Sequence, residues 1–468
     1  MTKVLLIYPF LRGRVDRSRF RFPPLGVAYL AAALREAGHS VEVLDCTFMS
    51  RREALDRALA ARADIVGISC LVTMQDDALW FAGHLRPRCD LLIAGGPLPT
   101  CSPERFLESF DLVVRGEGEA TLIEIVAAFE SGADPADVPG TVRGSNRATR
   151  SAPAAAGPGC LPAPRPDSPA AACRPFTRDL NAIPFPARDL LPNDAYLAFG
   201  RRRYGFGVTT VLSTRGCPYA CEFCSNVVFG RSYRERSAAN VVDEIEGVLR
   251  LGYERISFAD DVFTMNRARV LAVCAEIRRR GLRFDWECLA RVDGFEPALA
   301  REMRRAGCRR VFFGIESGND EILRLMRKGI TTAQARAAVL AAAAAGLETG
   351  AFFILCYPGE TDDTVLETLR FATSLPLDYV GLTMPYPLPG TDLERRVGEG
   401  GGRPWDPRRS PVLNQVLIYD GDFSALKMRF AIVKGHTQVV IRRRFGRLAP
   451  AALALVERPS DALFRRLR

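Results

Sequence analysis

Three cysteines stand close together in residues 213–226, which read STRGCPYACEFCSN. Cys217, Cys221 and Cys224 are separated by three and two residues, so one loop can turn all three thiols toward a common centre. Thiolates are soft ligands that suit zinc and iron–sulfur clusters, and in a cluster each cysteine takes one iron. The chemistry that this spacing indicates is therefore metal binding.

Four explanations compete for the triad. A disulfide framework needs paired cysteines and an oxidising compartment, whereas this chain has thirteen cysteines and resembles a cytosolic protein in composition. A structural zinc site needs a fourth ligand, but the three histidines lie far away in sequence and no second CxxC pair follows. Chance clustering is the third explanation. An iron–sulfur cluster accepts three cysteines and leaves its fourth iron open to another molecule, and the pattern favours it.

The segments around the triad predict the scaffold that positions it. From about residue 205, apolar runs alternate with helical patterns, which predicts six strand–helix units of a full or partial barrel. Helix starts are expected at Ser237 and at Thr331 or Thr332. Active residues of such folds lie at the carboxyl ends of the strands, and the triad follows the first strand directly. The expected strands are TTVLS, RISFA, FDWECLA, RVFFGI, GAFFIL and YVGLT.

The first 135 residues also alternate strand and helix patterns, beginning with KVLLIYP. This predicts an α/β unit with a Rossmann-like, doubly wound parallel sheet, which binds ligands outside the carboxyl ends of its strands. Glycines at these ends let the backbone approach a large flat or phosphorylated ligand, although each pair taken alone also fits a simple turn. The residues expected at this edge are Tyr8, Ser69, Thr73, Gly95, Gly96 and Pro97.

Composition divides the chain into four expected segments, which are 1–135, an Ala/Pro-rich linker at 136–190, a barrel at 191–400 and a C-terminal helical region at 401–468. The last segment holds fourteen Lys and Arg against five Asp and Glu, or +9 of the net +10. Its few aromatics argue against a nucleic-acid partner. A basic amphipathic segment suits peripheral contact with an anionic membrane, or a solvated cap. The absence of a long apolar run predicts a cytoplasmic protein.

Several motifs resemble those of one enzyme superfamily. CPYACEFC is similar to the CxxxCxxC signature of radical S-adenosylmethionine (SAM) enzymes. ISFADDVFT, GIESGND, CYPGETDD and PYPLPGTDL, each after a predicted strand, resemble strand-end motifs of the same superfamily. In the N-terminal half, PPLGVAYLAAALREAGH, AGGPLPT and VVRGEGEATL resemble the cobalamin-binding domain that precedes a large radical SAM class. The resemblance covers most of the chain.

The resemblance implies cofactors and contacts. The three cysteines would hold a 4Fe–4S cluster whose open iron chelates the amino and carboxylate groups of SAM, and reductive cleavage would yield a 5′-deoxyadenosyl radical. An electron donor such as flavodoxin or ferredoxin would supply the electron. Phe223 would lie against the adenine, and Tyr357 and Pro358 would flank it.

Further SAM contacts follow from the same resemblance. Glu316 and Ser317 would meet the ribose or the amino-acid part, and Arg291 would pair with the SAM carboxylate. Asp260 and Asp261 form an acidic pair at the barrel mouth, where helix capping and substrate contact are equal alternatives. The remaining barrel cysteines are expected to be core thiols, and they are Cys274, Cys288, Cys308 and Cys356.

One departure concerns cobalamin. The DxHxxG motif, which supplies a histidine ligand to cobalt in other cobalamin domains, is missing here, and His39 is expected in a turn. The radical SAM class in question commonly lacks that histidine. The resemblance therefore implies a cobalamin-dependent radical SAM methyltransferase acting on a small-molecule or lipid-like substrate held between the barrel mouth and the N-terminal sheet. The alternatives are a cyclase, rearrangement or oxidation enzyme of the same class, and a non-catalytic iron–sulfur or cobalamin sensor.

Overall fold

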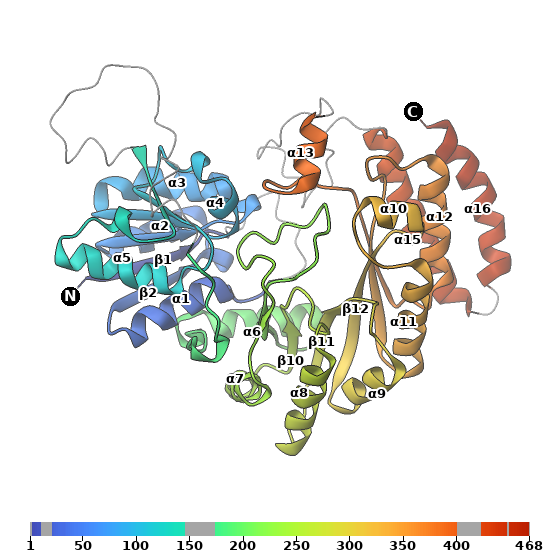
Figure 1. Cartoon of the computed structure of the whole chain (residues 1–468), viewed down its shortest axis with the longest axis horizontal. Coiled ribbons are helices and arrows are strands. Elements are labelled where there is room, and N and C mark those ends of the chain that lie inside the picture. Colours follow the sequence, from blue (N-terminus) through green and yellow to red (C-terminus); the bar gives the residue numbers. More distant parts are fainter. Residues whose placement is uncertain (1, 11–20, 146–173, 400–422, 447–448, 468) are drawn as a thin grey trace. The chain divides into compact units, whose positions relative to one another are not determined.

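The chain forms two units, each built around a sheet of its own (Figure 1). Unit 1 comprises residues 1–208 and 226–235, and unit 2 comprises residues 209–225 and 236–468. The computed structural model describes residues 2–10, 21–145, 174–399, 423–446 and 449–467. Much of the predicted linker, with Cys160 and Cys173, lies outside the described residues, as does the start of the predicted C-terminal segment. The division into four segments stays a prediction.

The sheet of unit 1 has the strand order β2-β1-β3-β4-β5-β6. Its first five strands run parallel, and β6 is antiparallel to β5. The strands are β1 (Lys3–Tyr8), β2 (Ser40–Asp45), β3 (Ile65–Ser69), β4 (Leu91–Gly95), β5 (Leu112–Val114) and β6 (Thr141–Arg143). Sheet pairing thus continues into the segment that was expected as a linker. The order confirms the predicted Rossmann-like sheet and brings the carboxyl ends of β1, β3 and β4 next to each other.

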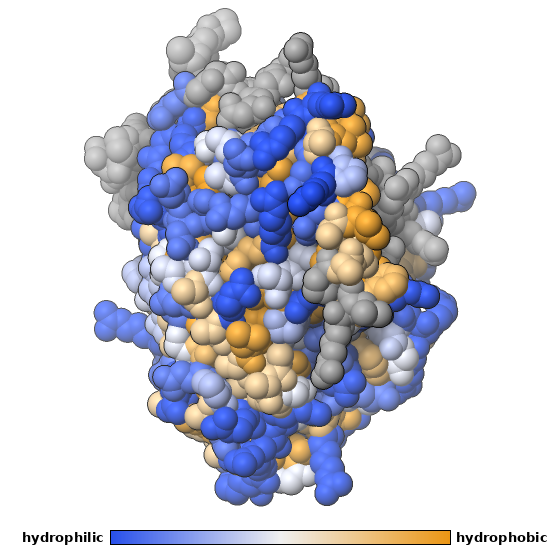
Figure 2. Space-filling model, turned by 90° about the vertical axis from the view of Figure 1, so that its right-hand side faces the viewer, coloured by the Kyte–Doolittle hydropathy of each residue, from blue (hydrophilic) through white to orange (hydrophobic). Residues whose placement is uncertain are grey.

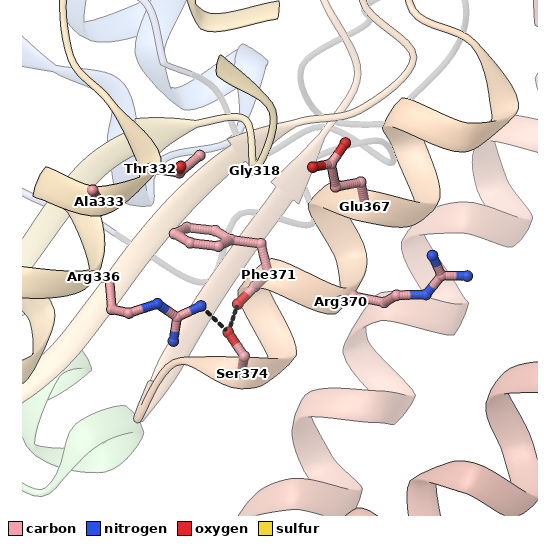
Figure 3. Close-up of a pocket in the computed structure, with 8 residues that line it drawn as sticks. All are labelled: Gly318, Thr332, Ala333, Arg336, Glu367, Arg370, Phe371 and Ser374. Carbon is pink, nitrogen blue, oxygen red and sulfur yellow. Dashed lines mark hydrogen bonds between the residues drawn. The ribbon is translucent and has the colours of Figure 1, made fainter. Parts of the chain in front are cut away.

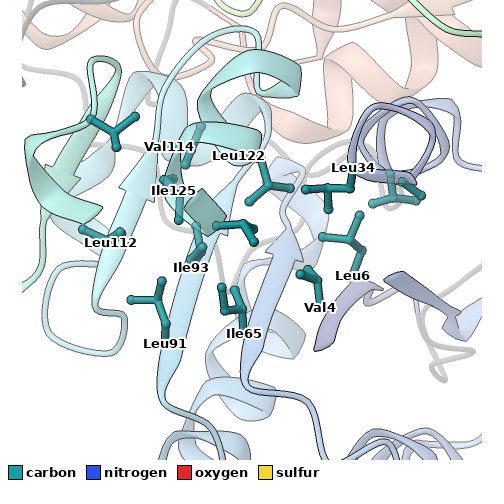
Figure 4. Close-up of a cluster of buried hydrophobic side chains, with 14 of the residues drawn as sticks. Val4, Leu6, Leu34, Ile65, Leu91, Ile93, Leu112, Val114, Leu122 and Ile125 are labelled. Carbon is teal, nitrogen blue, oxygen red and sulfur yellow. The ribbon is translucent and has the colours of Figure 1, made fainter. Parts of the chain in front are cut away.

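One hydrophobic cluster of unit 1 lies on one face of this sheet (Figure 4), while Leu5, Val66 and Leu92 are buried on the other face. Val4 and Ile93 from the strands pack with Leu34 from α1 and Ile125 from α5, and all four are buried. Near-continuous apolar strands are typical of parallel sheets that are covered by helices. The helices of unit 1 are α1 (Leu25–Glu36), α2 (Arg51–Ala60), α3 (Gln75–Leu85), α4 (Pro97–Cys101), α5 (Glu119–Ser131) and α6 (Asn193–Tyr204).

The sheet of unit 2 has the order β14-β13-β12-β11-β10-β7, so each strand lies beside its neighbour in sequence. Strands β10 to β14 pair in parallel. The strands are β7 (Val208–Val211), β10 (Arg255–Phe258), β11 (Asp285–Ala290), β12 (Cys308–Glu316), β13 (Glu348–Ile354) and β14 (Tyr379–Thr383), with the short β8 (Thr214–Arg215) and β9 (Arg234–Glu235) outside this sheet. All six predicted barrel strands are therefore present.

Helices connect these strands, and their starts follow the predicted caps. The Ser237 side chain accepts a hydrogen bond from Asn240 N at the start of α7, and Thr331 forms a capping box with Gln334 at the start of α11. Both predicted helix starts are confirmed. The helices of unit 2 are α7 (Ala238–Arg250), α8 (Arg267–Arg279), α9 (Pro297–Arg305), α10 (Asp320–Leu325), α11 (Thr332–Ala344), α12 (Asp362–Ser374), α13 (Asp392–Glu399), α15 (Ala425–Phe445) and α16 (Ala449–Arg466).

The C-terminal helices pack onto the end of this unit. Helix α15 lies against β14 and α12, and α16 pairs with α15. The contact with the sheet depends on Gly435, because a Cβ there would lie 2.4 Å from Leu382 Cδ1 and 2.7 Å from Leu369 Cδ2. A missing side chain thus sets how closely α15 approaches the sheet.

We expect Gly435→Ala to destabilise unit 2 by about 1–3 kcal/mol, because the added methyl overpacks a buried contact. The matched control is Gly247→Ala in α7, where the nearest atom to a new Cβ is Arg250 Nη2 at an ordinary 3.8 Å. That control should gain roughly 0.5–1 kcal/mol from helix propensity. Thermal unfolding followed by circular dichroism measures both shifts, and a Gly435→Ala protein as stable as the control would contradict the packing argument.

Candidate active site

The cysteine triad lies on the loop that follows β7 and β8 in unit 2. All three thiols are free, with Cys224 exposed and Cys217 and Cys221 half-buried. Burial raises the pKa of Cys217. The residue Cys224 is exposed as a whole, but desolvation of its thiol group by the surrounding loop, together with Cys221 and Cys217, raises its pKa to about 12. All three thiols lie within one short loop, at residues 217–224.

The donor set of this loop fits an iron–sulfur cluster better than a single ion. In the described part of the chain, no three His, Cys, Asp or Glu side chains close on one metal position. A 4Fe–4S cluster presents three separate irons, so its cysteines stand further apart than the ligands of one zinc ion. Because a bound cation deprotonates its thiol ligands outright, the raised thiol pKa values do not prevent ligation.

A buried carboxylate fixes the start of this loop. Asp260, fully buried after β10, accepts hydrogen bonds from Ser213 N (2.6 Å), Thr214 N (3.0 Å) and the Ser213 hydroxyl. Burial raises the pKa of the Asp260 carboxyl, and nearby Arg269 opposes that effect. Asp260 caps no helix, since Asn266 is the N-cap of α8. Its hydrogen bonds come from the backbone amides of Ser213 and Thr214 and from the Ser213 hydroxyl.

A second buried carboxylate holds the middle of the loop. Glu222 is 4% exposed, and its Oε2 accepts a hydrogen bond of 2.6 Å from the Tyr357 hydroxyl. Arg396 Nη1 of α13 lies 3.1 Å from the same oxygen, while Arg396 Nη2 donates to Pro358 O at 2.8 Å. Backbone contacts add to these, because Leu393 N donates to Glu222 O at 3.0 Å. The loop, the turn after β13 and α13 are thereby joined.

Sequence reasoning missed Glu222 and Arg396. An acidic residue between two cysteine ligands was the available signal for Glu222, because a carboxylate that enters a buried loop needs a partner. For Arg396 no local pattern points to the loop. Tyr357 has its ring fully buried and its hydroxyl engaged, so any contact of Tyr357 with a nucleotide runs through its backbone.

Phe223 belongs to the loop itself, between Glu222 and Cys224. Its half-buried ring lies edge-on to Tyr357, with centroids 6.5 Å apart and planes at 81°. Lys328 Nζ lies 5.8 Å from the Phe223 centroid and pairs with Glu316 Oε1 at 2.9 Å. The structure thus brings Phe223, Tyr357 and Glu316, three predicted SAM contacts, into one linked group.

Glu316 has a strained backbone. Its φ is +75°, a left-handed conformation that is rare for a residue with a side chain, and the β12–β13 register shifts between Gly314 and Glu316. The carboxylate turns back over Gly314, where a Cβ would lie 2.8 Å from Glu316 Oε1. Such strain is common at functional sites. Ser317 differs, because it is fully buried and its hydroxyl contacts Thr368 Oγ1 at 3.1 Å.

Arg291 is largely engaged by protein groups. Its Nε donates to Asp293 Oδ1 at 2.8 Å, its Nη2 donates to Lys328 O at 2.9 Å, and its guanidinium lies 3.5 Å from the Tyr219 ring centroid. Only 5% of Arg291 is exposed. Its pairing with the SAM carboxylate stays a prediction. The four cysteines predicted as core thiols (Cys274, Cys288, Cys308 and Cys356) are buried, as expected.

A groove lies on the helical side of unit 2, where Gly318 after β12 meets α11 and α12 (Figure 3). It has a volume of about 570 Å³ and lies between α11 and α12. Arg336 Nη2 donates to Ser374 Oγ at 2.9 Å across it. A Cβ on Gly318 would lie 2.5 Å from Phe371 Cβ, so the backbone at the inner end of the groove is tightly packed. The groove is lined by Gly318, Thr332, Ala333, Arg336, Glu367, Arg370, Phe371 and Ser374.

The residues of unit 1 that are predicted to bind cobalamin lie together at the carboxyl ends of its parallel strands. Tyr8, Ser69 and Gly95 end the neighbouring strands β1, β3 and β4, and Ser69 pairs with Gly95 in register. Thr73 follows β3, and the start of α4 follows β4. The predicted residues are partly accessible, and they are Tyr8, Ser69, Thr73, Gly95, Gly96 and Pro97.

Gly96 shows why small residues occupy this edge. Its φ is +102°, and a Cβ would meet Cys70 N at 3.0 Å and Cys70 O at 3.1 Å. Around Gly95, by contrast, the nearest atom to a new Cβ is Val114 Cβ at 3.9 Å. Backbone open to a large flat ligand fits cobalamin. His39 lies in the turn before β2, at the opposite edge, which confirms the turn prediction.

Comparison with known proteins agrees with both halves of this geometry. Residues 211–372 match the family model of the radical SAM superfamily, and residues 11–126 match that of the B12 binding domain. An uncharacterized methyltransferase of Pyrococcus horikoshii is 34% identical over 404 residues, which cover 84% of this chain and 82% of the relative. An anaerobic magnesium-protoporphyrin IX monomethyl ester cyclase of Cereibacter sphaeroides is 29% identical, over 84% of this chain and 63% of its own length.

A solved structure shares the fold. The radical SAM methyltransferase TsrM from Kitasatospora setae, with cobalamin and a [4Fe-4S] cluster bound, superposes with a TM-score of 0.68 at 24% identity, covering 86% of this chain and 78% of that one. The chain belongs to the radical SAM superfamily, among the members that carry a B12-binding domain. It is an enzyme, and its cofactors are a 4Fe–4S cluster, SAM and cobalamin. The family and cofactor predictions are confirmed.

The turn after β13 contains a carboxyl group with an altered pKa. Burial raises the pKa of Glu360 from 4.5 to about 8, although the backbone amides of Tyr357 and Cys356 donate hydrogen bonds to it. Between these pH values the folded protein keeps a proton that the unfolded chain releases. The stabilisation from this proton is complete below pH 4.5 and is lost as the pH rises to about 8.

We expect Glu360→Gln to remove the fall in stability between pH 4.5 and about 8, because glutamine cannot ionise. Between pH 5 and pH 8 the free energy of unfolding of the wild type should fall more than that of the variant, by a few kcal/mol at about 1.4 kcal/mol per pH unit. Urea unfolding at a series of pH values measures the difference. Glu321→Gln, at an exposed carboxylate of α10, is the control and should keep the wild-type slope. Parallel slopes for wild type and Glu360→Gln would contradict the prediction.

Proposed function

We propose that the protein is a methyltransferase that moves a methyl group onto an unactivated carbon of its substrate. One combination of features carries this proposal. The chain has the three-cysteine loop and, in unit 1, partly accessible residues at the carboxyl ends of a parallel sheet of the B12-binding type. It is also 34% identical to a methyltransferase. When bound, the cluster and SAM supply a 5′-deoxyadenosyl radical and cobalamin supplies the methyl group.

The chain's own residues would bind and orient the reactants. Cys217, Cys221 and Cys224 would ligate the cluster, and the buried carboxylates Asp260 and Glu222 would keep their loop in place. A loop with fixed backbone positions its ligands without a cost in reorganisation at each turnover. Tight packing around the turn after β13 would exclude water from the reactive nucleotide.

Further residues would receive SAM. Phe223 and the backbone at Tyr357 and Pro358 would contact the adenine, while Glu316 is placed for the ribose or the amino group. Ser317 would contribute through its backbone, because its hydroxyl faces Thr368. Arg291, which carries positive charge close to the loop, would attract the SAM carboxylate. An electron donor such as flavodoxin or ferredoxin would reduce the cluster.

Cobalamin would bind at the carboxyl edge of the unit 1 sheet. The strand ends at Tyr8, Ser69 and Gly95 and the following turns at Thr73 and 96–97 would surround one face of the corrin ring. In the described residues no histidine lies at the carboxyl ends of these strands. When bound there, cobalamin would supply the methyl group for the substrate.

A second candidate is cyclisation, which the 29% identity to an anaerobic cyclase supports. The two reactions differ in the mass of the product. A methyltransferase adds the methyl group of SAM, and a cyclase does not.

The test uses the purified, anaerobically reconstituted chain with SAM whose methyl group is CD₃, together with an extract of small molecules and lipids. We expect 5′-deoxyadenosine and a product that has gained a CD₃ group. Cys221→Ala should yield neither, and should lose the cluster absorbance, because one iron has lost its ligand. The control Cys89→Ala removes a half-buried thiol beside β4 and should behave as wild type. Deoxyadenosine without CD₃ transfer would favour the cyclase, and deoxyadenosine from Cys221→Ala would exclude the cluster assignment.

We also propose that α15 contacts an anionic membrane surface, which would deliver a lipid-like substrate. Among the described helices, none has the length and hydrophobicity to cross a bilayer. Leu426, Val433 and Val440 are 59–64% exposed at seven-residue intervals, and exposed Arg429 and Arg443 stand beside them. Figure 2 views the molecule from the side on which α16 lies in Figure 1, where apolar side chains are scattered among hydrophilic ones. This pattern is typical of helices that lie in a membrane interface.

We expect the protein to float with vesicles that contain phosphatidylserine and to stay behind with pure phosphatidylcholine, because arginines attract anionic headgroups. Val433→Glu should abolish flotation, because it adds a negative charge to the exposed apolar row of Leu426, Val433 and Val440. Leu251→Glu, at the exposed residue that follows α7, is the control and should float as wild type. Equal flotation of Val433→Glu would refute the contact, as would equal binding to neutral vesicles.

A further inference from the structure

Helices cover one face of the sheet of unit 2, and on the other face some apolar side chains of the described residues are exposed. Helices α11, α12 and α15 lie on the same side of β12 (Figure 1). On β12, Val311, Phe313 and Ile315 are fully buried, as expected for the covered face. Phe312 points to the opposite side, because side chains alternate along a strand. We call this opposite side the inner face.

The inner face carries an exposed row of apolar side chains. Leu289 of β11 pairs with Phe312 of β12, which pairs with Gly350 and then with Tyr379 of β14, so these residues share one face. Phe352 follows Gly350 by two residues and lies on the same side. Leu289 is 37%, Phe352 38% and Tyr379 41% exposed. We call Leu289, Phe312, Phe352 and Tyr379 the apolar wall.

Two glycines make this wall flat. Phe312 pairs with Gly350, and a Cβ on Gly350 would lie 2.3 Å from Phe312 Cδ1. Phe352 pairs with Gly381 in the same way, with a Cβ 2.5 Å from Phe352 Cδ1. Each ring therefore lies across the backbone of the next strand. The two rings stack with centroids 5.5 Å apart and planes at 20°.

At the Glu316 end of β12, the apolar wall adjoins the linked group of Phe223, Tyr357 and Glu316. Gly314, which pairs with Phe352, lies beneath the ion pair of Glu316 with Lys328. Lys328 in turn lies beside Phe223 of the cysteine loop. Within unit 2, a continuous surface thus leads from the cysteine loop down the inner face.

Charged groups close the lower end. Arg310 donates to Glu287 (3.1 Å), to Glu348 (2.7 Å) and to the Tyr379 hydroxyl (2.6 Å). Because these partners occupy the guanidinium, it offers little to a charged group of a ligand. From Arg310 to Glu316 the strand rises about 3.3 Å per residue, or roughly 20 Å in total. The Arg310 guanidinium also lies 3.8 Å from the Tyr379 ring centroid, so the part of the wall open to a ligand is Leu289, Phe312 and Phe352, between two clusters of paired charges.

Exposed apolar area costs free energy in water, and stacked rings present a large flat surface to a ligand. We propose that the apolar wall is the substrate-binding surface, and that the substrate is an uncharged, apolar molecule with a flat or extended body that packs against Phe312 and Phe352. The inference rests on the proposed function, which it deepens by assigning the substrate class. Its reactive carbon would lie at the Glu316 end, toward the cysteine loop.

The test uses an uncharged aromatic probe, 6-propionyl-2-(dimethylamino)naphthalene, whose fluorescence rises in apolar surroundings. We expect saturable binding to the full chain with one site per molecule. Phe352→Lys and Leu289→Lys should each weaken binding by at least about tenfold, because a ligand would have to desolvate the new charge. Both positions are partly exposed, so the lysines reach solvent and the fold is retained.

Leu340→Lys on α11 and Leu455→Lys on α16 are matched controls, since these leucines are 50% and 79% exposed on the helical layer. They should bind the probe as wild type does. If circular dichroism shows that Phe352→Lys is unfolded, the binding measured for Leu289→Lys, on another strand, tests the proposal instead. Unchanged binding by the inner-face variants overturns the proposal, and so does loss of binding by either control or a lack of saturation. Because probe binding requires neither SAM nor cluster, this outcome is independent of the CD₃ transfer assay.

Discussion

Two buried carboxylates constrain the loop on which the chemistry depends. Asp260 gathers the backbone amides at the start of the loop, and Glu222 is held by Tyr357 and Arg396 at its middle. A charge removed from water is stable only when hydrogen bonds or an opposite charge replace the lost hydration. Each carboxylate therefore ties the loop to one arrangement of its donors. The three thiols are positioned by groups that do not themselves bind metal.

Strain at the strand ends adds a second constraint. Glu316 at the end of β12 and Cys356 after β13 both have a left-handed φ, of +75° and +62°. Each such residue costs about 1–3 kcal/mol, which surrounding packing and hydrogen bonds must offset. The ion pair with Lys328 holds Glu316, and the buried Glu360 holds the backbone after Cys356. Both strained residues lie where the chain turns toward the cysteine loop.

Much of this was predictable from sequence. Apolar runs that alternate with helical patterns predicted the six barrel strands, and cap residues such as Ser237 predicted the helix starts, because these signals are local. The partner of Glu222 is 174 residues away at Arg396, and no local pattern encodes such a contact. The same holds for Ser317, whose hydroxyl turns to Thr368 because α12 packs there. Residue types indicated the chemistry, while tertiary packing decided which atoms remain accessible.

The rings of the apolar wall and the glycines under them have one more consequence. Phe312 with Gly350, and Phe352 with Gly381, occupy a shared volume, so neither partner can enlarge alone. Divergence at these positions must be correlated across the strand pair: a side chain can appear at the glycine only when the neighbouring ring shrinks. Exchange of such pairs would move bulk from one strand to the next and reshape the surface while the sheet register is preserved. Related enzymes could thereby change selectivity without altering the cysteine loop.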